Sequence, residues 1–199
     1  MLLKKLISFM RNILCILGLI CVAPFLILAS LALFIEDGLP IFFIQDRLGE
    51  NQKKFQIIKI RTLKNATPHI GTHELDSRHQ LVVGRVIRKI KLDEFPQLIN
   101  VIKGDINLIG PRPGLPNQHL LLQNREQRGV FNIKPGVTGL AQVMGYDMSN
   151  PEELSRIDEM YASKKSFYIN TLILMATFIS LPKKYLSKIF NIDENHAMQ

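Results

Sequence analysis

The 199-residue sequence has only two cysteines, Cys15 and Cys21, and both lie in its apolar N-terminal stretch. Two thiols inside one hydrophobic run suggest neither a disulfide framework nor a zinc site. The sequence also lacks internal repeats and low-complexity tracts. These absences exclude a disulfide-stabilised scaffold and indicate a reducing compartment.

Charge is absent from Ile13 to Ile35, while basic residues such as Lys5 and Arg11 precede this run. As a helix rising about 1.5 Å per residue, the run would be about 35 Å long, enough to cross a bilayer core. It is also longer than the roughly 7–15 apolar residues of a signal peptide, which argues against cleavage. The sequence therefore predicts a membrane segment.

Pro24 lies near the middle of this segment and leaves two geometries open. A straight spanning helix would keep the basic N-terminus cytoplasmic and place the rest of the chain outside. Alternatively, a bend at Pro24 would let both halves return to the cytoplasmic face as a re-entrant hairpin. Ser30 could then bond backbone groups freed at the bend.

Basic residues exceed acidic ones by 25 to 17, giving a net charge of +8, yet 47% of residues are hydrophobic. This balance suits anionic lipid headgroups, phosphorylated substrates or nucleic acid. No helix-turn-helix or aromatic RNA-binding pattern is present in the sequence, so we expect no nucleic-acid partner.

Residue patterns predict an α+β fold that is mostly helical. Residues 40–45 and 55–61 are β-prone and joined by turn residues Gly49–Asn51, which predicts a hairpin. Residues 65–78 have the composition of a loop, and residues 117–128 that of a helix closed by Gly129.

The apolar residues 167–181 are flanked by lysine pairs. They are too few to span a bilayer comfortably, so they predict an interfacial helix, with a plain core helix as the alternative. The residues after Phe190 have the composition of a disordered tail. We accordingly divide the chain into an anchor (1–36), a catalytic domain (37–190) and a tail (191–199).

Two adjacent carboxylates, Asp93 and Glu94, lie at the expected start of a helix. This helix is expected to end at Gly104. Asp93 resembles an N-cap, which is the common role of such a residue. An ionised Asp at a helix start can also act as a nucleophile or a magnesium ligand. Arg88 and Arg112 could neutralise a diphosphate, and Pro113 helps to fix the backbone around Arg112.

At this point the chain resembles the small monotopic phosphoglycosyl transferases among the bacterial sugar transferases. Ordered blocks over nearly its whole length carry the resemblance: Ala23-Pro24, Pro40–Phe43, Gln45–Gly49, Lys59–Thr62, Gly84–Lys89, Leu92–Asn100, Lys103–Asp105, Gly110–Pro113 and Lys134–Gln142. The order and spacing of these blocks are more specific than any one of them.

The resemblance implies a re-entrant helix and a catalytic domain on the cytoplasmic face of the bacterial inner membrane. It implies that a sugar 1-phosphate moves from a UDP-sugar to polyprenol (undecaprenyl) phosphate, with UMP released and Mg²⁺ as cofactor. Such a reaction initiates lipid-linked glycan synthesis, such as that of O-antigen, capsule or glycoprotein glycans. The bilayer, downstream glycosyltransferases and a homodimer are the further partners expected.

The resemblance also implies residue roles. Asp93 would be the nucleophile, forming an aspartyl-phosphosugar intermediate, and would contact the metal; Glu94 would assist at the metal or in proton transfer. The expected substrate-binding residues are Lys59, Arg61, Arg88, Arg112, Pro113, Gln142 and Tyr146.

Tyr146 departs from the family pattern, because an arginine implicated in nucleotide-sugar binding commonly stands there. A tyrosine can stack on a base or sugar but cannot replace a cation, so Arg156 or Lys134 would have to compensate. Residues 67–75 and Asn117-Gln118 resemble the branch that uses N-acetylated, 6-deoxy hexosamine donors. Two other functions remain open: a degenerate membrane-tethered scaffold, or a module that binds anionic ligands.

Overall fold

The computed structural model describes residues 2–65, 67 and 79–192. Most of the predicted loop 65–78, the donor-specificity segment within it and most of the tail lie outside these residues. Packing divides the chain into two compact units: unit 1 is Met1–Gln45 with Gln56–Gly104, and unit 2 is Asp46–Phe55 with Asp105–Gln199. The predicted mostly helical α+β class is confirmed.

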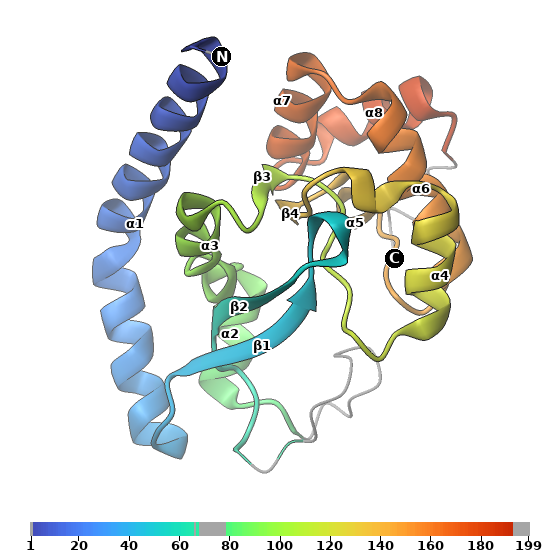
Figure 1. Cartoon of the computed structure of the whole chain (residues 1–199). Coiled ribbons are helices and arrows are strands. Elements are labelled where there is room, and N and C mark those ends of the chain that lie inside the picture. Colours follow the sequence, from blue (N-terminus) through green and yellow to red (C-terminus); the bar gives the residue numbers. More distant parts are fainter. Residues whose placement is uncertain (1, 66, 68–78, 193–199) are drawn as a thin grey trace. The chain divides into compact units, whose positions relative to one another are not determined.

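Unit 1 begins with helix α1 (Leu2–Asp37), which Figure 1 shows as one long helix. Its residues Ser8–Asp37 are long and apolar enough to cross a membrane. The expected break at Pro24 is not seen, because α1 continues through this residue. Ser30 Oγ donates to Leu26 O, four residues back, at 2.7 Å. Ser30 therefore bonds a carbonyl of its own turn, as serines in continuous helices commonly do.

One face of the second half of α1 packs into unit 1. Ala29 and Leu33 are buried there, and Val22 and Leu26 are partly buried on the same face, as their spacing of three and four residues requires. They pack against residues from strand β2 (Lys54–Ile60), helix α2 (Val82–Lys89) and the 3-10 turn η4 (Leu92–Glu94), namely Ile60, Leu81, Ile87 and Leu92. Helix α1 is therefore a long apolar helix, and one face of its second half forms part of the core of unit 1.

Gly84 lets α2 approach the end of β2 closely. A Cβ at this position would lie 2.3 Å from the backbone oxygen of Thr62, a separation that no side chain tolerates. The backbone N–H of Leu81 also donates to Thr62 O at 3.1 Å. Glycine is therefore required where α2 crosses the chain at Thr62.

The predicted hairpin is confirmed: β1 (Phe42–Leu48) pairs with β2. Its turn contains the short 3-10 helix η1 (Glu50–Gln52), in which Asn51 and Gln52 have positive φ. The base of the hairpin belongs to unit 1 and its tip to unit 2.

Unit 2 contains a two-stranded parallel sheet that the sequence did not predict. Strand β3 (Asn107–Ile109) pairs with β4 (Gly136–Thr138), and Asn107 lies opposite Gly136. The crossover contains helix α4 (His119–Gln127), within the predicted range, and the 3-10 turn η5 (Val130–Asn132). Gly129 closes α4 as predicted, with φ of +66°. Three-residue strands are too short to give a period-2 signal.

The remaining helices of unit 2 enclose its core. They are α5 (Leu140–Val143), α6 (Pro151–Lys164), α7 (Phe167–Ala176) and α8 (Leu181–Phe190). Buried residues from all four, including Val143, Ile157, Ile173 and Leu186, form one cluster.

The single helix expected over residues 167–181 is wrong, because α7 ends at Ala176 and α8 begins at Leu181. Burial of Ile169, Ile173 and Ala176 on one face of α7 leaves Phe167 and Tyr168 exposed. This segment is thus a core helix on one face and an apolar surface on the other.

Candidate active site

Asp93 lies in the short turn η4 and is 8% exposed. Lys91 precedes it in the left-handed conformation, and Pro96, rather than Asp93, is the residue before helix α3 (Gln97–Lys103). The predicted N-cap role is therefore wrong: no side-chain cap is made at the start of α3, and Asp93 lies a turn earlier. The carboxylate does not cap α3, so a role in chemistry stays open.

Two cations accompany the carboxylate pair in unit 1. Lys59 Nζ on β2 donates to Glu94 Oε1 at 3.0 Å, and both side chains are largely buried. Arg88, in the last turn of α2, donates through Nε to Thr62 Oγ1 at 2.6 Å. Sequence reasoning placed Lys59, Arg88, Asp93 and Glu94 at one site, and their contacts and mutual electrostatic effects bring them together here.

These neighbours act on the Asp93 carboxyl in opposite directions. Burial is the largest effect and raises its pKa; the charge of Glu94 raises it further, whereas Lys59 and Arg88 lower it. The net result is a pKa above the usual range of an aspartate. A carboxyl group whose pKa is raised by burial and balanced by specific charged partners is a candidate for a reactive group.

Asn100 joins α3 to β2 and so holds the Asp93 turn beside Lys59. Its amide donates to Gln56 O at 2.7 Å, and its Oδ1 accepts from the backbone N–H of Ile58 at 3.1 Å. Asn100 is fully buried, so these two bonds are not shared with solvent. The sequence analysis missed this positioning role, although Asn100 ends one of its blocks.

Gln97 is a further residue that the sequence analysis did not single out. It opens α3, is 2% exposed, and its Nε2 has no hydrogen-bond partner within the described part of the chain. A buried amide donor without an acceptor is unfavourable, and such groups often mark ligand sites. Gln97 is therefore a candidate donor to a substrate oxygen.

The Pro-Arg-Pro corner in unit 2 is fixed through four consecutive backbone carbonyls. Pro111 O accepts from the N–H of Gly136 at 2.9 Å, and Gly114 O from the N–H of Leu48 at 3.1 Å. Between them, Arg112 O accepts from Arg125 Nη1 at 2.8 Å and Pro113 O from Arg47 Nη1 at 3.1 Å. The backbone of Arg112 is thus held on both sides.

Arg125 is itself fixed by a buried ion pair. It is 2% exposed, and its Nε and Nη2 both donate to Asp158 Oδ2, at 3.0 and 2.6 Å. Arg47 is also largely removed from water; burial and then the charge of Arg112 lower its pKa to about 10. Two guanidinium groups therefore lie close enough to repel each other, an arrangement that favours an anion.

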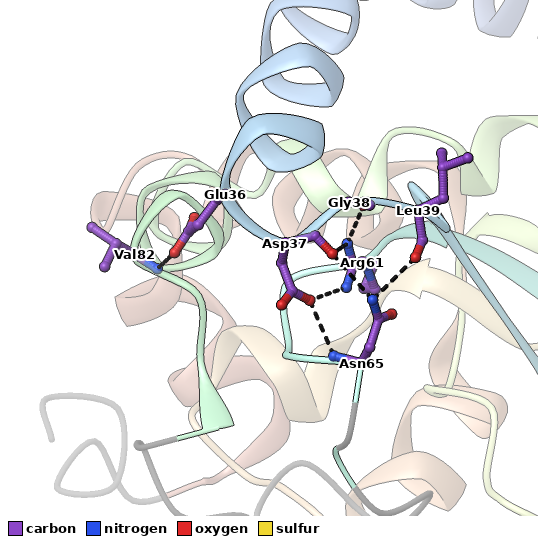
Figure 2. Close-up of polar contacts among 7 residues, drawn as sticks. All are labelled: Glu36, Asp37, Gly38, Leu39, Arg61, Asn65 and Val82. Atoms are coloured by element: carbon purple, nitrogen blue, oxygen red, sulfur yellow. Dashed lines mark hydrogen bonds and ion pairs between the residues drawn. The ribbon is translucent and has the colours of Figure 1, made fainter.

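Arg61 lies elsewhere in unit 1, at the end of α1. Its guanidinium forms an ion pair with Asp37 and donates to Gly38 O at 2.7 Å, and Asn65 bonds the same segment (Figure 2). Since Arg61 is 5% exposed, these contacts define a structural role for it.

Gln142 and Tyr146 both lie in unit 2. Gln142 is half-buried, and within the described ranges its Oε1 has no partner. Tyr146 packs on the core cluster. The hydrogen bonds that Arg156 donates to the Glu153 carboxylate are the main cause that raises its pKa, and the nearby Tyr146 phenol adds to it. Arg156 therefore stands near the position where the family pattern has its arginine.

The site residues also bear on the expected magnesium. Residues 2–65, 67 and 79–192 contain no cluster of three or more His, Cys, Asp or Glu side chains able to hold a metal. Mg²⁺, however, is commonly held by one or two carboxylates together with substrate phosphates and water. Asp93, with Glu94 beside it, fits that mode rather than an all-protein cage.

Comparison with known proteins identifies the family of the chain. The profile of the bacterial sugar transferase family matches residues 2–184. This match covers nearly the whole chain. The chain belongs to the bacterial sugar transferase family.

Individual relatives make the relationship more specific. The chain is 37% identical over 160 residues to the uncharacterized sugar transferase EpsL of Bacillus subtilis, covering 80% of this chain and 79% of that protein. It is 38% identical over 127 residues to the UDP-glucose:undecaprenyl-phosphate glucose-1-phosphate transferase of Caulobacter vibrioides, covering 62% of this chain and 48% of that protein. It therefore spans about half the length of the second relative.

A third relative is named for a different sugar. The UDP-N-acetylgalactosamine-undecaprenyl-phosphate N-acetylgalactosaminephosphotransferase of Aeromonas hydrophila is 32% identical over 165 residues, covering 78% of this chain and 38% of that protein. The names of the second and third relatives share undecaprenyl phosphate and differ in the sugar.

Proposed function

We propose that this chain transfers a sugar 1-phosphate from a UDP-sugar to polyprenol phosphate and releases UMP. The observation that carries the proposal is the buried Asp93 carboxyl, with its raised pKa, among Lys59, Arg88 and Glu94. Family membership and the relatives named for undecaprenyl-phosphate transferases support it.

The reaction proceeds in two displacements. A carboxylate oxygen of Asp93 attacks the phosphorus that carries the sugar, the bond from that phosphorus to the UMP oxygen breaks, and UMP leaves. An oxygen of polyprenol phosphate then attacks the same phosphorus. The aspartyl–phosphorus bond breaks, the product is a polyprenyl diphosphosugar, and the carboxylate is restored. A covalent intermediate of this kind gives ping-pong kinetics.

The other residues bind and orient the phosphates. Arg88, fixed by Thr62, and Lys59, fixed by Glu94, supply positive charge beside Asp93. Glu94 keeps Lys59 in place and assists in proton transfer. Arg112 and Pro113 form the phosphate-binding corner of unit 2. A magnesium ion held by Asp93 and the substrate would neutralise diphosphate charge.

The acceptor is a lipid, so the enzyme must work at a membrane. Helix α1 supplies the apolar segment, and the exposed aromatic residues of α7 supply an interfacial surface. We place the catalytic residues on the cytoplasmic face, where nucleotide sugars are available. A re-entrant path for α1 would require a bend at Pro24 in the bilayer, in place of the continuous helix described above.

The donor sugar is proposed to be an N-acetylated hexosamine, including 6-deoxy forms. The relatives are named for different sugars, and the donor-specificity segment lies largely outside the described residues. Arg156, near Tyr146, supplies the cation for the nucleotide. A catalytically degenerate scaffold is the alternative that Tyr146 favours.

The test is UMP release from a panel of UDP-sugars with Mg²⁺, with and without polyprenol phosphate. Wild-type protein should release a stoichiometric burst of UMP before lipid is added and turn over after it. Asp93→Asn should lose both, while Asp46→Asn, at an exposed position of the same residue type, should retain both.

The outcomes separate the alternatives. Release of UMP by Asp93→Asn at the wild-type rate would refute the assigned nucleophile. If wild-type protein releases no UMP with any donor and Tyr146→Arg does release UMP, the chain is a degenerate scaffold.

A further inference from the structure

The last two residues of α1, Glu36 and Asp37, are both carboxylates, and each bonds a different segment of unit 1. Glu36 bonds the start of α2, and Asp37 bonds the chain that follows β2. These two segments meet again where Arg88 donates to Thr62, a contact that the proposed function uses. The two carboxylates therefore hold the two sides of one contact at the candidate active site.

Glu36 supplies a cap that α2 does not make itself. The residue before the helix is Leu81, whose side chain makes no cap bond, and the first turn contains no acidic residue. One oxygen of the Glu36 carboxylate accepts from the N–H of Val82 at 2.6 Å (Figure 2), and the other accepts from the N–H of Val83 at 2.9 Å. Two N–H groups that a helix start leaves unpaired are thus bonded by a negative charge from α1.

Helix α2 transmits this contact to Arg88. Arg88 follows Val82 by six residues, which places it about 9 Å further along the same helix. Gly84 packs directly on the Thr62 backbone, where a Cβ would lie 2.3 Å from the carbonyl oxygen, and Ile87 is buried in the core. Because α2 is packed this closely, a shift of its first turn would also displace Arg88.

Asp37 fixes Thr62 from both sides along the chain. Its carboxylate forms an ion pair with Arg61, the residue before Thr62, and its Oδ2 accepts from the backbone N–H of Asn65 at 3.1 Å (Figure 2). Asn65 Nδ2 also donates to Asp37 O at 3.1 Å. Thr62 is buried, and its hydroxyl accepts from Arg88 Nε at 2.6 Å. A hydrogen bond of this length is lost when its two atoms separate by about 1 Å more.

We infer that Glu36 and Asp37 are positioning residues for the transfer reaction, which hold Arg88 on Thr62 from the end of the apolar helix. Both act through other side chains, so neither is a catalytic residue. The inference rests on the proposed function, because Arg88 is assigned there to the substrate phosphates. It adds that the end of α1 contributes to catalysis as well as supplying an apolar segment.

The experiment compares variants of the full chain in phospholipid nanodiscs. Glu36→Ala removes the cap, Asp37→Asn removes the charge that holds the Thr62 segment, and Thr62→Val removes the hydroxyl that accepts from Arg88. A further variant combines Glu36→Ala with Thr62→Val. Thr62→Ser keeps the hydroxyl, and Glu152→Ala, the matched control, removes an exposed carboxylate from the first turn of another helix, α6.

For each variant, kcat and KM for UMP release are measured below the onset of thermal unfolding, together with hydrogen exchange of peptides that cover α2. We expect Glu36→Ala, Asp37→Asn and Thr62→Val each to lower kcat about tenfold with little change in KM, as misplacement of one charge-assisted hydrogen bond in the transition state implies. The double variant should lose no more than the larger single loss. Thr62→Ser and Glu152→Ala should keep the wild-type kcat, and α2 should exchange faster in Glu36→Ala.

Two results on active protein would overturn the inference. The first is a Glu36→Ala protein that unfolds at a lower temperature but keeps the wild-type kcat while folded, which would make this carboxylate a helix cap only. The second is a double variant whose loss is the product of the two single losses, since Glu36 and Thr62 would then act independently.

A wild-type protein that releases no UMP would refute the proposed function instead. In that case hydrogen exchange decides the inference. Faster exchange of α2 in Glu36→Ala would support the positioning of Arg88, and unchanged exchange would overturn it.

Discussion

The Asp93 turn and the Arg112 corner hold their charged side chains in different ways. At Asp93, charged side chains of both signs face one another, and Lys59 bonds Glu94 directly. At Arg112, the side chains of Arg125 and Arg47 donate to backbone carbonyls, and two backbone N–H groups complete the set. The first arrangement sets a protonation state, whereas the second fixes a position. The two regions should therefore respond differently to substitution and to pH.

The largest effect is expected at the buried pair behind the corner. Arg125→Met leaves Asp158 as a buried, unpaired carboxylate and should lower the free energy of unfolding by about 3–5 kcal/mol. Replacing both partners, in Arg125→Met with Asp158→Leu, should recover much of that loss. Arg112 O still lacks its donor in the double variant, so KM for the donor should stay raised. Denaturant unfolding and steady-state kinetics measure the two effects.

The control is a second ion pair, between Arg128 and Glu159, which also joins the α4 segment to α6 but lies at the surface. Arg128 and Glu159 lie 2.8 Å apart and are partly exposed, so their removal should change stability by at most about 1 kcal/mol. If the double variant regained wild-type KM together with its stability, the bond to Arg112 O would have no positioning role.

Gly84→Ala should disturb the Asp93 region through packing. The new Cβ would meet Thr62 O, and forced overpacking typically costs about 1–3 kcal/mol. Because Thr62 also binds Arg88, activity should fall further than stability alone explains. Gly18→Ala in α1 is the matched control, since its Cβ would lie 3.5 Å from Leu98 Cδ1, an ordinary contact. Thermal unfolding and UMP release should separate the two variants.

The pH profile tests the charge balance at Asp93. The nucleophile must be ionised, so kcat/KM should fall at a higher pH than for an ordinary aspartate. Lys59→Gln removes a charge that lowers the pKa of Asp93 and should move this acidic limb to higher pH; Glu94→Gln should move it to lower pH. Shifts of the same sign in both variants would contradict this account.

The same raised pKa has a consequence for folding. Between the unfolded and the folded pKa of Asp93, the native state binds more protons than the unfolded state. The stability that protonation of Asp93 confers is therefore present at low pH and falls as pH rises through that window. Asp93→Asn should remove this part of the pH dependence of unfolding, which denaturant titrations at several pH values can measure.

The smallest effect is expected at Arg156. If it supplies the cation that the family pattern places at Tyr146, Arg156→Gln should raise KM for the UDP-sugar about tenfold, as loss of one charge-assisted hydrogen bond implies, with kcat little changed. Arg128→Gln, an arginine of unit 2 outside this site, is the control. An unchanged KM for the UDP-sugar in Arg156→Gln would show that Arg156 does not bind the nucleotide.

Several local features could be predicted because they depend on neighbours in the sequence. The hairpin follows from β-prone runs around a turn, and the ends of α3 and α4 follow from Gly104 and Gly129, which adopt the left-handed conformation there. The N-cap at Asp93 was wrong because Pro96 and the following Gln97 start the helix later. The strands β3 and β4 were missed because a strand of three residues is too short to show the alternation of apolar and polar residues that marks a strand.

The sequence by itself determined the charge-free segment, the helix ends and the ordered blocks that identify a bacterial sugar transferase. It did so because these depend on residue types at short spacing. Only the tertiary structure decided which partners those blocks have. Arg47 bonds a carbonyl 66 residues away, Lys59 a carboxylate 35 residues away, and Arg61 the end of α1 rather than the Asp93 turn. Such partners are set by how the elements pack, and no local pattern of residues encodes them.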